Sequence, residues 1–145
     1  MTASLREQVR QRAQRRCEYC QLREEFDALS FHWDHIIAQK HRGRTVFENL
    51  AWSCYGCNNH KQSDIAGIDP EGATDDIVRL FHPRKDTWDE HFQWTGPELR
   101  GKTPTGRVTV YVLGINLPHR VALRRLLMAE AVFPPKSVPG DDMTQ

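Results

Sequence analysis

The chain has 145 residues, enough for one compact domain with a trailing subdomain, and its 39% hydrophobic and 27% charged residues suit a globular rather than a disordered protein. No stretch approaches the run of about 20 apolar residues that a membrane span needs, and the basic N-terminus lacks the apolar core of a signal peptide, so we expect a cytoplasmic protein without membrane contact. The net charge is only +1, but residues 1–61 hold ten basic and seven acidic side chains, whereas residues 62–145 hold ten and twelve. A surface for a polyanion is therefore expected in the first part, unless its arginines only form a solvated helix face.

Five patterned segments precede residue 65. Apolar residues recur every four positions from 5 to 13, which predicts an amphipathic helix leading to the first cysteine. Residues 31–37 are rich in aromatic and branched side chains and predict a strand, and residues 39–45 predict a basic loop. A second short strand is expected at 50–53, followed by a helix over about 55–64. The predicted order is helix, strand, loop, strand, helix.

The second part of the chain is less strongly patterned. Gly67, Pro70 and Gly72 predict a loop, and residues 107–113 alternate in the manner of a strand. Residues 120–132 predict an amphipathic helix whose Leu123, Leu126 and Leu127 face inward.

These patterns predict three regions along the chain. Residues 1–64 are expected to form the chemically active core, and residues 65–135 an α/β extension packed on it. Prolines near the end predict that residues 136–145 form a flexible tail. No internal repeat is present in the sequence.

All four cysteines fall into two Cys-x-x-Cys pairs, Cys17 with Cys20 and Cys54 with Cys57. This spacing points two sulfurs to one side of a turn, so two such turns can complete the tetrahedral sulfur shell that zinc prefers. A disulfide framework is disfavoured by the cytoplasmic expectation, and a thioredoxin-like redox pair needs one such motif in a βαβ unit. We therefore expect one structural zinc ion, with a sizeable folded segment between the two pairs.

The segment between the cysteine pairs, together with the residue after the last cysteine, contains the parts of a one-metal phosphodiesterase. Asp34 and Asn58 offer hard oxygen ligands suited to a magnesium-like ion, and His35 offers an imidazole that can take a proton from water. On a regular strand, Asp34 and His35 point to opposite faces, and a local bend or bulge would let both reach one site.

Three motifs resemble the HNH nuclease family: WDHII at 33–37, ENL at 48–50 and CYGCNNHK at 54–61. The resemblance covers about residues 15–64. It implies an α+β protein with a ββα-metal core, structural zinc knuckles and a C-terminal α/β extension. The sequence departs from the family pattern at Ala38, where proline is common, and at 41–44, where a glycine pair is common.

The resemblance also implies roles for four residues. His35 is the expected general base, and Asp34 is the expected ligand of a catalytic Mg²⁺ or Mn²⁺ ion. Asn49 is expected to hold the loop and so orient the base. Asn58 stands where the family often has histidine and is expected to complete the metal shell, as in an H-N-N variant.

Each of these residues also has a plainer interpretation. His35 could be a packed strand histidine, and Asn58 could cap a helix without touching metal. His60 could contact phosphate or simply face solvent. His82 and His91 could approach a metal, but histidines satisfied among aromatic neighbours fit their context better. His32 and His41 flank the site without an assigned role.

The leading hypothesis is a metal-dependent endonuclease that hydrolyses DNA phosphodiester bonds. Lys40, Arg42, Arg44 and Lys61 are the expected nucleic-acid contacts, giving binding that weakens steeply with salt. The alternative is a non-catalytic zinc module that binds nucleic acid or a protein partner. Such a module has no need for Asp34, His35 and Asn58 together.

Overall fold

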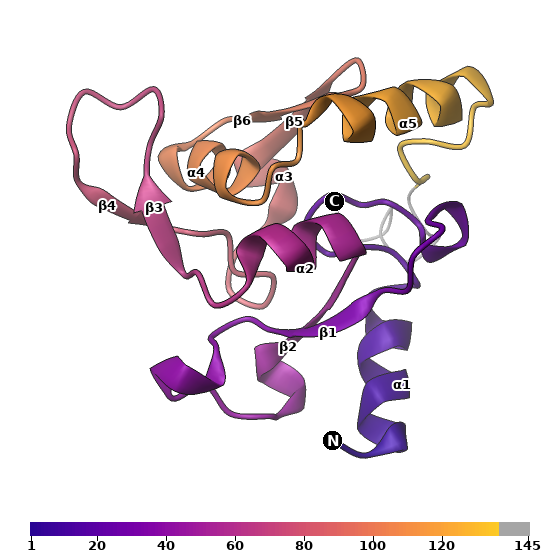
Figure 1. The fold of residues 1–145 in the computed structure, drawn as a ribbon, viewed down its shortest axis with the longest axis vertical. Helices are drawn as coiled ribbons and strands as arrows, with labels where there is room; N and C mark the ends of the chain where they lie inside the picture. The colour runs from indigo at the N-terminus through magenta and orange to yellow at the C-terminus, as the bar shows by residue number, and fades with distance from the viewer. Residues whose placement is uncertain (137–145) are drawn as a thin grey trace.

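A computed structural model of the chain, shown in Figure 1, describes residues 1–136. The first element is helix α1 (Ala3–Arg12), whose N-terminus is capped by the Thr2 hydroxyl accepting from the Leu5 amide at 3.0 Å. The helix buries Val9 completely and ends just before the first cysteine pair. The predicted N-terminal helix is therefore confirmed.

The centre of the first part is a strand, loop, strand and helix, in the predicted order. Strand β1 (His32–His35) pairs antiparallel with β2 (Leu50–Ser53), with Asp34 opposite Ala51. Short 3₁₀ turns at 24–26, 39–41 and 47–49 shape the connections. Helix α2 (Tyr55–Lys61) follows β2 directly, and it ends three residues earlier than expected because Gln62 adopts a positive φ of 47°. In Figure 1, α2 lies between the β1–β2 hairpin and the C-terminal helices.

The second part adds two more hairpins and three helices. Strand β3 (Ala66–Ile68) pairs with β4 (Ile77–Arg79), and β5 (Phe92–Thr95) pairs with β6 (Glu98–Gly101). The helices are α3 (Trp88–His91), α4 (Pro104–Val112) and α5 (Pro118–Ala129). Within residues 1–136, helices combine with small antiparallel sheets, which confirms the predicted α+β class.

The predicted strand at 107–113 is wrong, because this segment belongs to helix α4. The Thr103 hydroxyl caps the helix by accepting from the Gly106 amide at 3.0 Å, and Pro104 occupies the first turn. The alternating branched residues pack one helical face instead: Val108 and Val112 both border Gly67 of β3.

Helix α5 confirms the predicted C-terminal helix, but its inward face differs from the expected one. Leu126 is 68% exposed, whereas Arg120, Val121 and Arg124 are buried. Leu123 and Leu127 pack against the core as partly buried residues. The tail expected at 136–145 lies outside the described residues beyond position 136.

A single cluster of buried hydrophobic side chains links the first and second parts of the chain. Tyr19, Phe81 and Phe92 form its aromatic centre, with Tyr19 and Phe81 in an edge-on arrangement at 6.5 Å between ring centroids. The cluster therefore holds the extension against the segment that carries the cysteines. None of the described helices has the length and apolar character that crossing a membrane requires.

Candidate metal centre and catalytic site

The four cysteines come together as a buried cluster of sulfur atoms. Cys17, Cys20, Cys54 and Cys57 are all at most 2% exposed, and their Sγ atoms lie within 4.8 Å of one another. None of them forms a disulfide. The Sγ atoms of Cys20 and Cys54 are 3.6 Å apart, close to the separation of about 3.8 Å that follows from tetrahedral zinc with 2.3 Å bonds to sulfur. The cluster therefore fits a zinc ion.

The pKa values of two thiols in the cluster are shifted in opposite directions. Hydrogen bonds with the neighbouring sulfurs hold the pKa of the Cys20 thiol well below its usual value, and the bond with Cys17 has the largest effect. Burial raises the pKa of the Cys17 thiol, whereas a bound cation would favour its thiolate.

Asp34 is buried rather than open to solvent. Its side chain is 4% exposed, Oδ2 accepts from the Tyr19 hydroxyl at 2.7 Å, and Oδ1 accepts from the Lys61 ammonium at 3.2 Å. Burial raises the pKa of Asp34, and the Lys61 charge and the Tyr19 hydrogen bond oppose this rise. Each carboxylate oxygen can still accept one more bond, so the residue keeps the chemistry of a hard ligand.

Lys61 stands at the other end of this buried ion pair. The residue is 1% exposed, and its ammonium donates to Asp34, to the His35 carbonyl and to the Ile36 carbonyl, all at 3.2 Å. These acceptors use the three N–H groups of the ammonium. Lys61 therefore does not present its charge to a DNA phosphate, contrary to the expected contact, and instead fastens α2 to the end of β1.

His35 lies at the junction of β1 and the basic loop, with its side chain half-buried. Its Nε2 is 2.9 Å from the Thr45 hydroxyl, and that hydroxyl accepts from the side-chain amide of Gln39 at 3.2 Å. The register of β1 with β2 is regular through His35, so the bulge considered from the sequence is absent there. Within residues 1–136, the His35 Nδ1 atom has no hydrogen-bond partner.

Asn49 ties the two ends of the loop together. Its Oδ1 accepts from the Ile37 amide at 3.0 Å, and its Nδ2 donates to the carbonyls of Ile37 and Arg44 at 3.0 and 2.9 Å. Gly43 lies in the same crowded place, since a Cβ there would be 1.7 Å from the Ile37 carbonyl oxygen. This geometry matches the loop-holding role expected for Asn49.

Asn58 lies on the side of α2 that faces β1. It precedes Lys61 by three positions, so the two side chains share one helical face, and Lys61 contacts Asp34. In the described part of the chain the side-chain amide of Asn58 makes no hydrogen bond, and the cap of α2 is the Cys54 sulfur instead. The helix-cap interpretation of Asn58 is therefore not needed.

The basic loop presents its charges to solvent. Lys40, Arg42 and Arg44 are exposed, and Arg42 adopts a left-handed conformation with φ of 73°. Arg42 thus takes a backbone shape that glycine favours, which accounts for the glycines common at this place in the resembling family.

The two histidines of the aromatic segment make local contacts. His82 Nδ1 accepts from the Arg84 amide at 3.2 Å, and His91 Nδ1 pairs with the Thr103 hydroxyl at 2.6 Å. Among residues 1–136, Cys17, Cys20, Cys54 and Cys57 are the one group of three or more His, Cys, Asp or Glu side chains placed to hold an ion. His82 and His91 therefore bond residues of the extension and do not belong to this group.

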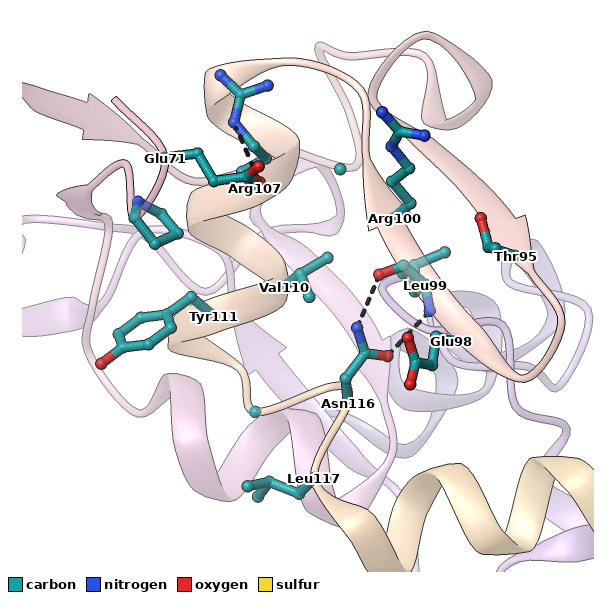
Figure 2. A pocket seen from close by; sticks show the side chains of 13 residues that line it. Glu71, Thr95, Glu98, Leu99, Arg100, Arg107, Val110, Tyr111, Asn116 and Leu117 are labelled. Atoms are coloured by element: carbon teal, nitrogen blue, oxygen red, sulfur yellow. Dashed lines mark hydrogen bonds and ion pairs between the residues drawn. The ribbon is translucent and has the colours of Figure 1, made fainter. Parts of the chain in front are cut away.

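A cavity of about 570 Å³ lies elsewhere, within the extension (Figure 2). Figure 2 shows Arg100 and Arg107 at one end and Tyr111 and Leu117 at the other. Asn116 points into the gap and bonds the backbone of Leu99 at 2.8 and 2.9 Å. None of the candidate catalytic residues lines this cavity, so it is separate from the site described above.

Comparison with known proteins assigns the first part of the chain. The family model described as HNH endonuclease matches residues 17–64. This segment is an HNH domain. It contains both cysteine pairs and every candidate catalytic residue, which confirms the resemblance found in the motifs.

A curated relative matches beyond the HNH domain. Over 115 residues the chain is 26% identical to the Septu protein PtuB of Bacillus thuringiensis, and the match covers 78% of this chain. The chain spans 41% of that protein's length. No solved structure matches the chain.

Three residues that the motifs did not single out contribute to the site. Tyr19 lies inside the first cysteine pair and bonds Asp34, and Thr45 ends the basic loop and bonds His35. Arg120, far along the sequence, contacts the sulfur cluster. No spacing signal in the sequence points to any of them.

Proposed function

We propose that this protein is a metal-dependent endonuclease that hydrolyses DNA phosphodiester bonds, with His35 as the general base. The main support is the match of residues 17–64 to the HNH endonuclease family. The loop that Asn49 holds beside His35 adds to it. An imidazole beside a loop of fixed conformation can take a proton from water, and a bound divalent ion would supply the charge stabilisation that hydrolysis needs.

The proton-accepting atom of His35 is proposed to be Nδ1, because Nε2 is engaged with the Thr45 hydroxyl. The Thr45 hydroxyl accepts from Gln39 and keeps a second lone pair for the Nε2–H of His35. With the proton on Nε2, the lone pair is on Nδ1, which is open to take a proton from water. Thr45 is thus a positioning residue that sets the tautomer of the base.

The catalytic ion is proposed to be Mg²⁺ or Mn²⁺, held by Asp34 and Asn58. When bound, such an ion offsets the charge that develops on the scissile phosphate and its leaving oxygen. Tyr19 and Lys61 keep the Asp34 carboxylate in place. The side-chain amide of Asn58, which has no hydrogen-bond partner in the described chain, supplies a neutral oxygen from the adjacent helix. The cysteine cluster is proposed to hold a structural zinc ion that anchors both ends of this segment.

Binding of the DNA backbone is proposed for Lys40, Arg42 and Arg44. These exposed residues lie on the loop next to His35 and carry the excess basic charge expected for this part of the chain. Lys61, which the sequence suggested as a further DNA contact, does not belong to this set because its ammonium is buried.

Cleavage of supercoiled plasmid tests the proposal. Zinc-loaded protein should nick plasmid with Mg²⁺ or Mn²⁺ and stop when these ions are omitted. His35→Ala should cut about 10² to 10⁴ times more slowly, because a general base contributes this much to rate. The matched control is His32→Ala, an exposed histidine at the start of the same strand, which should cut at the wild-type rate. Wild-type cutting by His35→Ala would remove His35 as the base.

A second experiment separates the enzyme from the alternative, a non-catalytic zinc module. Replacing Asn58 with histidine should shift the metal preference of cleavage toward the later transition metals, since nitrogen is a softer ligand than an amide oxygen. An unchanged ranking of metals would mean that Asn58 does not touch the ion. DNA binding without cleavage under every metal would favour the alternative.

A further inference from the structure

A side chain from outside the HNH domain contacts the sulfur cluster. Arg120, in the first turn of α5, places Nη2 3.0 Å from Cys57 Sγ and 3.6 Å from Cys54 Sγ. Its Nη1 donates to the carbonyls of Leu113 and Gly114 at 2.7 and 3.1 Å. One guanidinium therefore bridges the second cysteine pair and the link between α4 and α5.

The charge of Arg120 is balanced by the sulfurs. The residue is 8% exposed, and among the described residues it forms no ion pair with a carboxylate. Four thiolates around one zinc ion carry a formal charge of −2, and a buried anion of this kind is costly unless it receives hydrogen bonds or a counter-charge. Arg120 supplies both.

A glycine inside the second cysteine pair makes room for this contact. A Cβ on Gly56 would lie 2.9 Å from the Arg120 Cζ atom and 3.0 Å from its Nε. Gly56 lies in the first turn of α2, where glycine weakens a helix relative to alanine. The closeness of the guanidinium accounts for the glycine, so two elements far apart in the sequence are shaped for one contact.

We propose that Arg120 completes the zinc site from the C-terminal extension, so that zinc binding and docking of helix α5 stabilise each other. The N–H groups withdraw charge from the sulfurs of Cys57 and Cys54, which favours the metal-bound state. By thermodynamic reciprocity, the loaded site favours the docked position of Arg120. The inference rests on the zinc assignment proposed above but not on nuclease activity.

The first test measures zinc affinity of the full chain by competition with a chromophoric chelator. Arg120→Met should bind zinc about 10–100 times more weakly, the usual loss when a residue that bonds a metal ligand is removed. Arg125→Met is the matched control, because Arg125 is an exposed arginine on the same helix and makes no described contact with sulfur. An affinity of Arg120→Met within twofold of wild type would overturn the inference.

A spectroscopic readout separates the hydrogen bond from general loss of packing. With Co²⁺ in place of zinc, losing the N–H donors raises the energy of the sulfur lone pairs, so the sulfur-to-cobalt charge-transfer band should move to longer wavelength in Arg120→Met. Arg124→Met serves as the comparison, because Arg124 is also buried in α5 but bonds the Pro97 and Ile115 carbonyls instead of sulfur. Its band should stay at the wild-type position, and equal shifts in both variants would contradict the inference.

Hydrogen exchange tests the reciprocal effect on the helix. Zinc should slow amide exchange in residues 118–129 of the wild type, and this slowing should shrink in Arg120→Met. If that variant fails to fold, Gly56→Ala replaces it, since its methyl group displaces the guanidinium and should also weaken zinc binding. Unchanged zinc affinity in folded Gly56→Ala overturns the inference. Wild-type protein that retains no zinc overturns the zinc assignment as well, whereas zinc-loaded wild type with unaffected variants overturns this inference alone.

Discussion

Replacing Lys61 with methionine is expected to lower the free energy of unfolding by about 3–5 kcal/mol, the cost of breaking a buried ion pair by removing one partner. Methionine has a similar length and an apolar chain, so the loss of packing should be small. The cost arises because the Asp34 carboxylate and the carbonyls of His35 and Ile36 lose their shared donor at 3.2 Å. Urea unfolding followed by tryptophan fluorescence, with zinc present, measures it.

Two comparisons make this prediction specific. Lys40→Met removes an exposed lysine and should change the unfolding free energy by less than about 0.5 kcal/mol. In an Asp34→Asn background, Lys61→Met should cost about 1–2 kcal/mol less than in the wild type, because no buried charge is left without a partner. The reasoning would be refuted if Lys61→Met unfolded like wild type and instead lowered DNA affinity with a shallower salt dependence. That result would restore the phosphate contact expected from the sequence.

Three further substitutions test the loop and one surface ion pair. Ala38→Pro should stabilise the protein by about 0.4–1 kcal/mol in thermal unfolding, because Ala38 has φ of −61° and its amide has no acceptor in the described chain; a loss of stability would contradict this. Arg42→Gly should stabilise the fold by relieving about 1 kcal/mol of backbone strain, and it should weaken DNA binding in a filter assay. A fall in both stability and DNA affinity would contradict this. Hydrogen bonds from Arg79 lower the pKa of Asp86, so that pair stabilises the fold above the unfolded carboxyl pKa of about 4, and the stability is lost as pH falls through the folded pKa. Asp86→Asn should therefore cost about 1 kcal/mol at pH 7 and progressively less below about pH 4, and a cost independent of pH would contradict the pairing.

Helix α4 shows where local pattern misleads. Residues 107–113 alternate between valines and other side chains, which is the period of a strand, yet the segment is helical. Thr103 and Pro104 form a helix-start signal just before this segment, which the alternation alone does not reveal. Packing of Val108 and Val112 against Gly67 then selects the helix, and that contact spans more than 40 positions.

The sequence predicts helix α5, but it does not predict which side of the helix faces the core. Its leucines suggested an apolar inner face, whereas two arginines are buried and Leu126 is exposed. Buried arginines need acceptors, and those of Arg120 and Arg124 are sulfurs and carbonyl groups that come from distant segments. Hydrophobic periodicity cannot anticipate partners of that kind.

The HNH segment was more predictable because its elements are short and its motifs are ordered along the chain. The β1–β2 hairpin, helix α2, the sulfur cluster and the loop-holding contacts of Asn49 all follow from it. The burial of Lys61 did not follow, since nothing in its motif distinguishes a lysine facing solvent from one facing Asp34. The partners Tyr19 and Thr45 likewise depend on how the loops fold over β1.

The bonds between Asn116 and Leu99 bear on how this protein behaves at high concentration. In the described structure β6 pairs only with β5, and the Asn116 amide donates to the Leu99 carbonyl and accepts from the Leu99 amide, as a neighbouring strand would. A strand edge with open backbone groups is a template for pairing with other chains, which leads to aggregation. One side chain thus occupies the N–H and C=O groups of Leu99, so these two groups are not open to a strand of another chain.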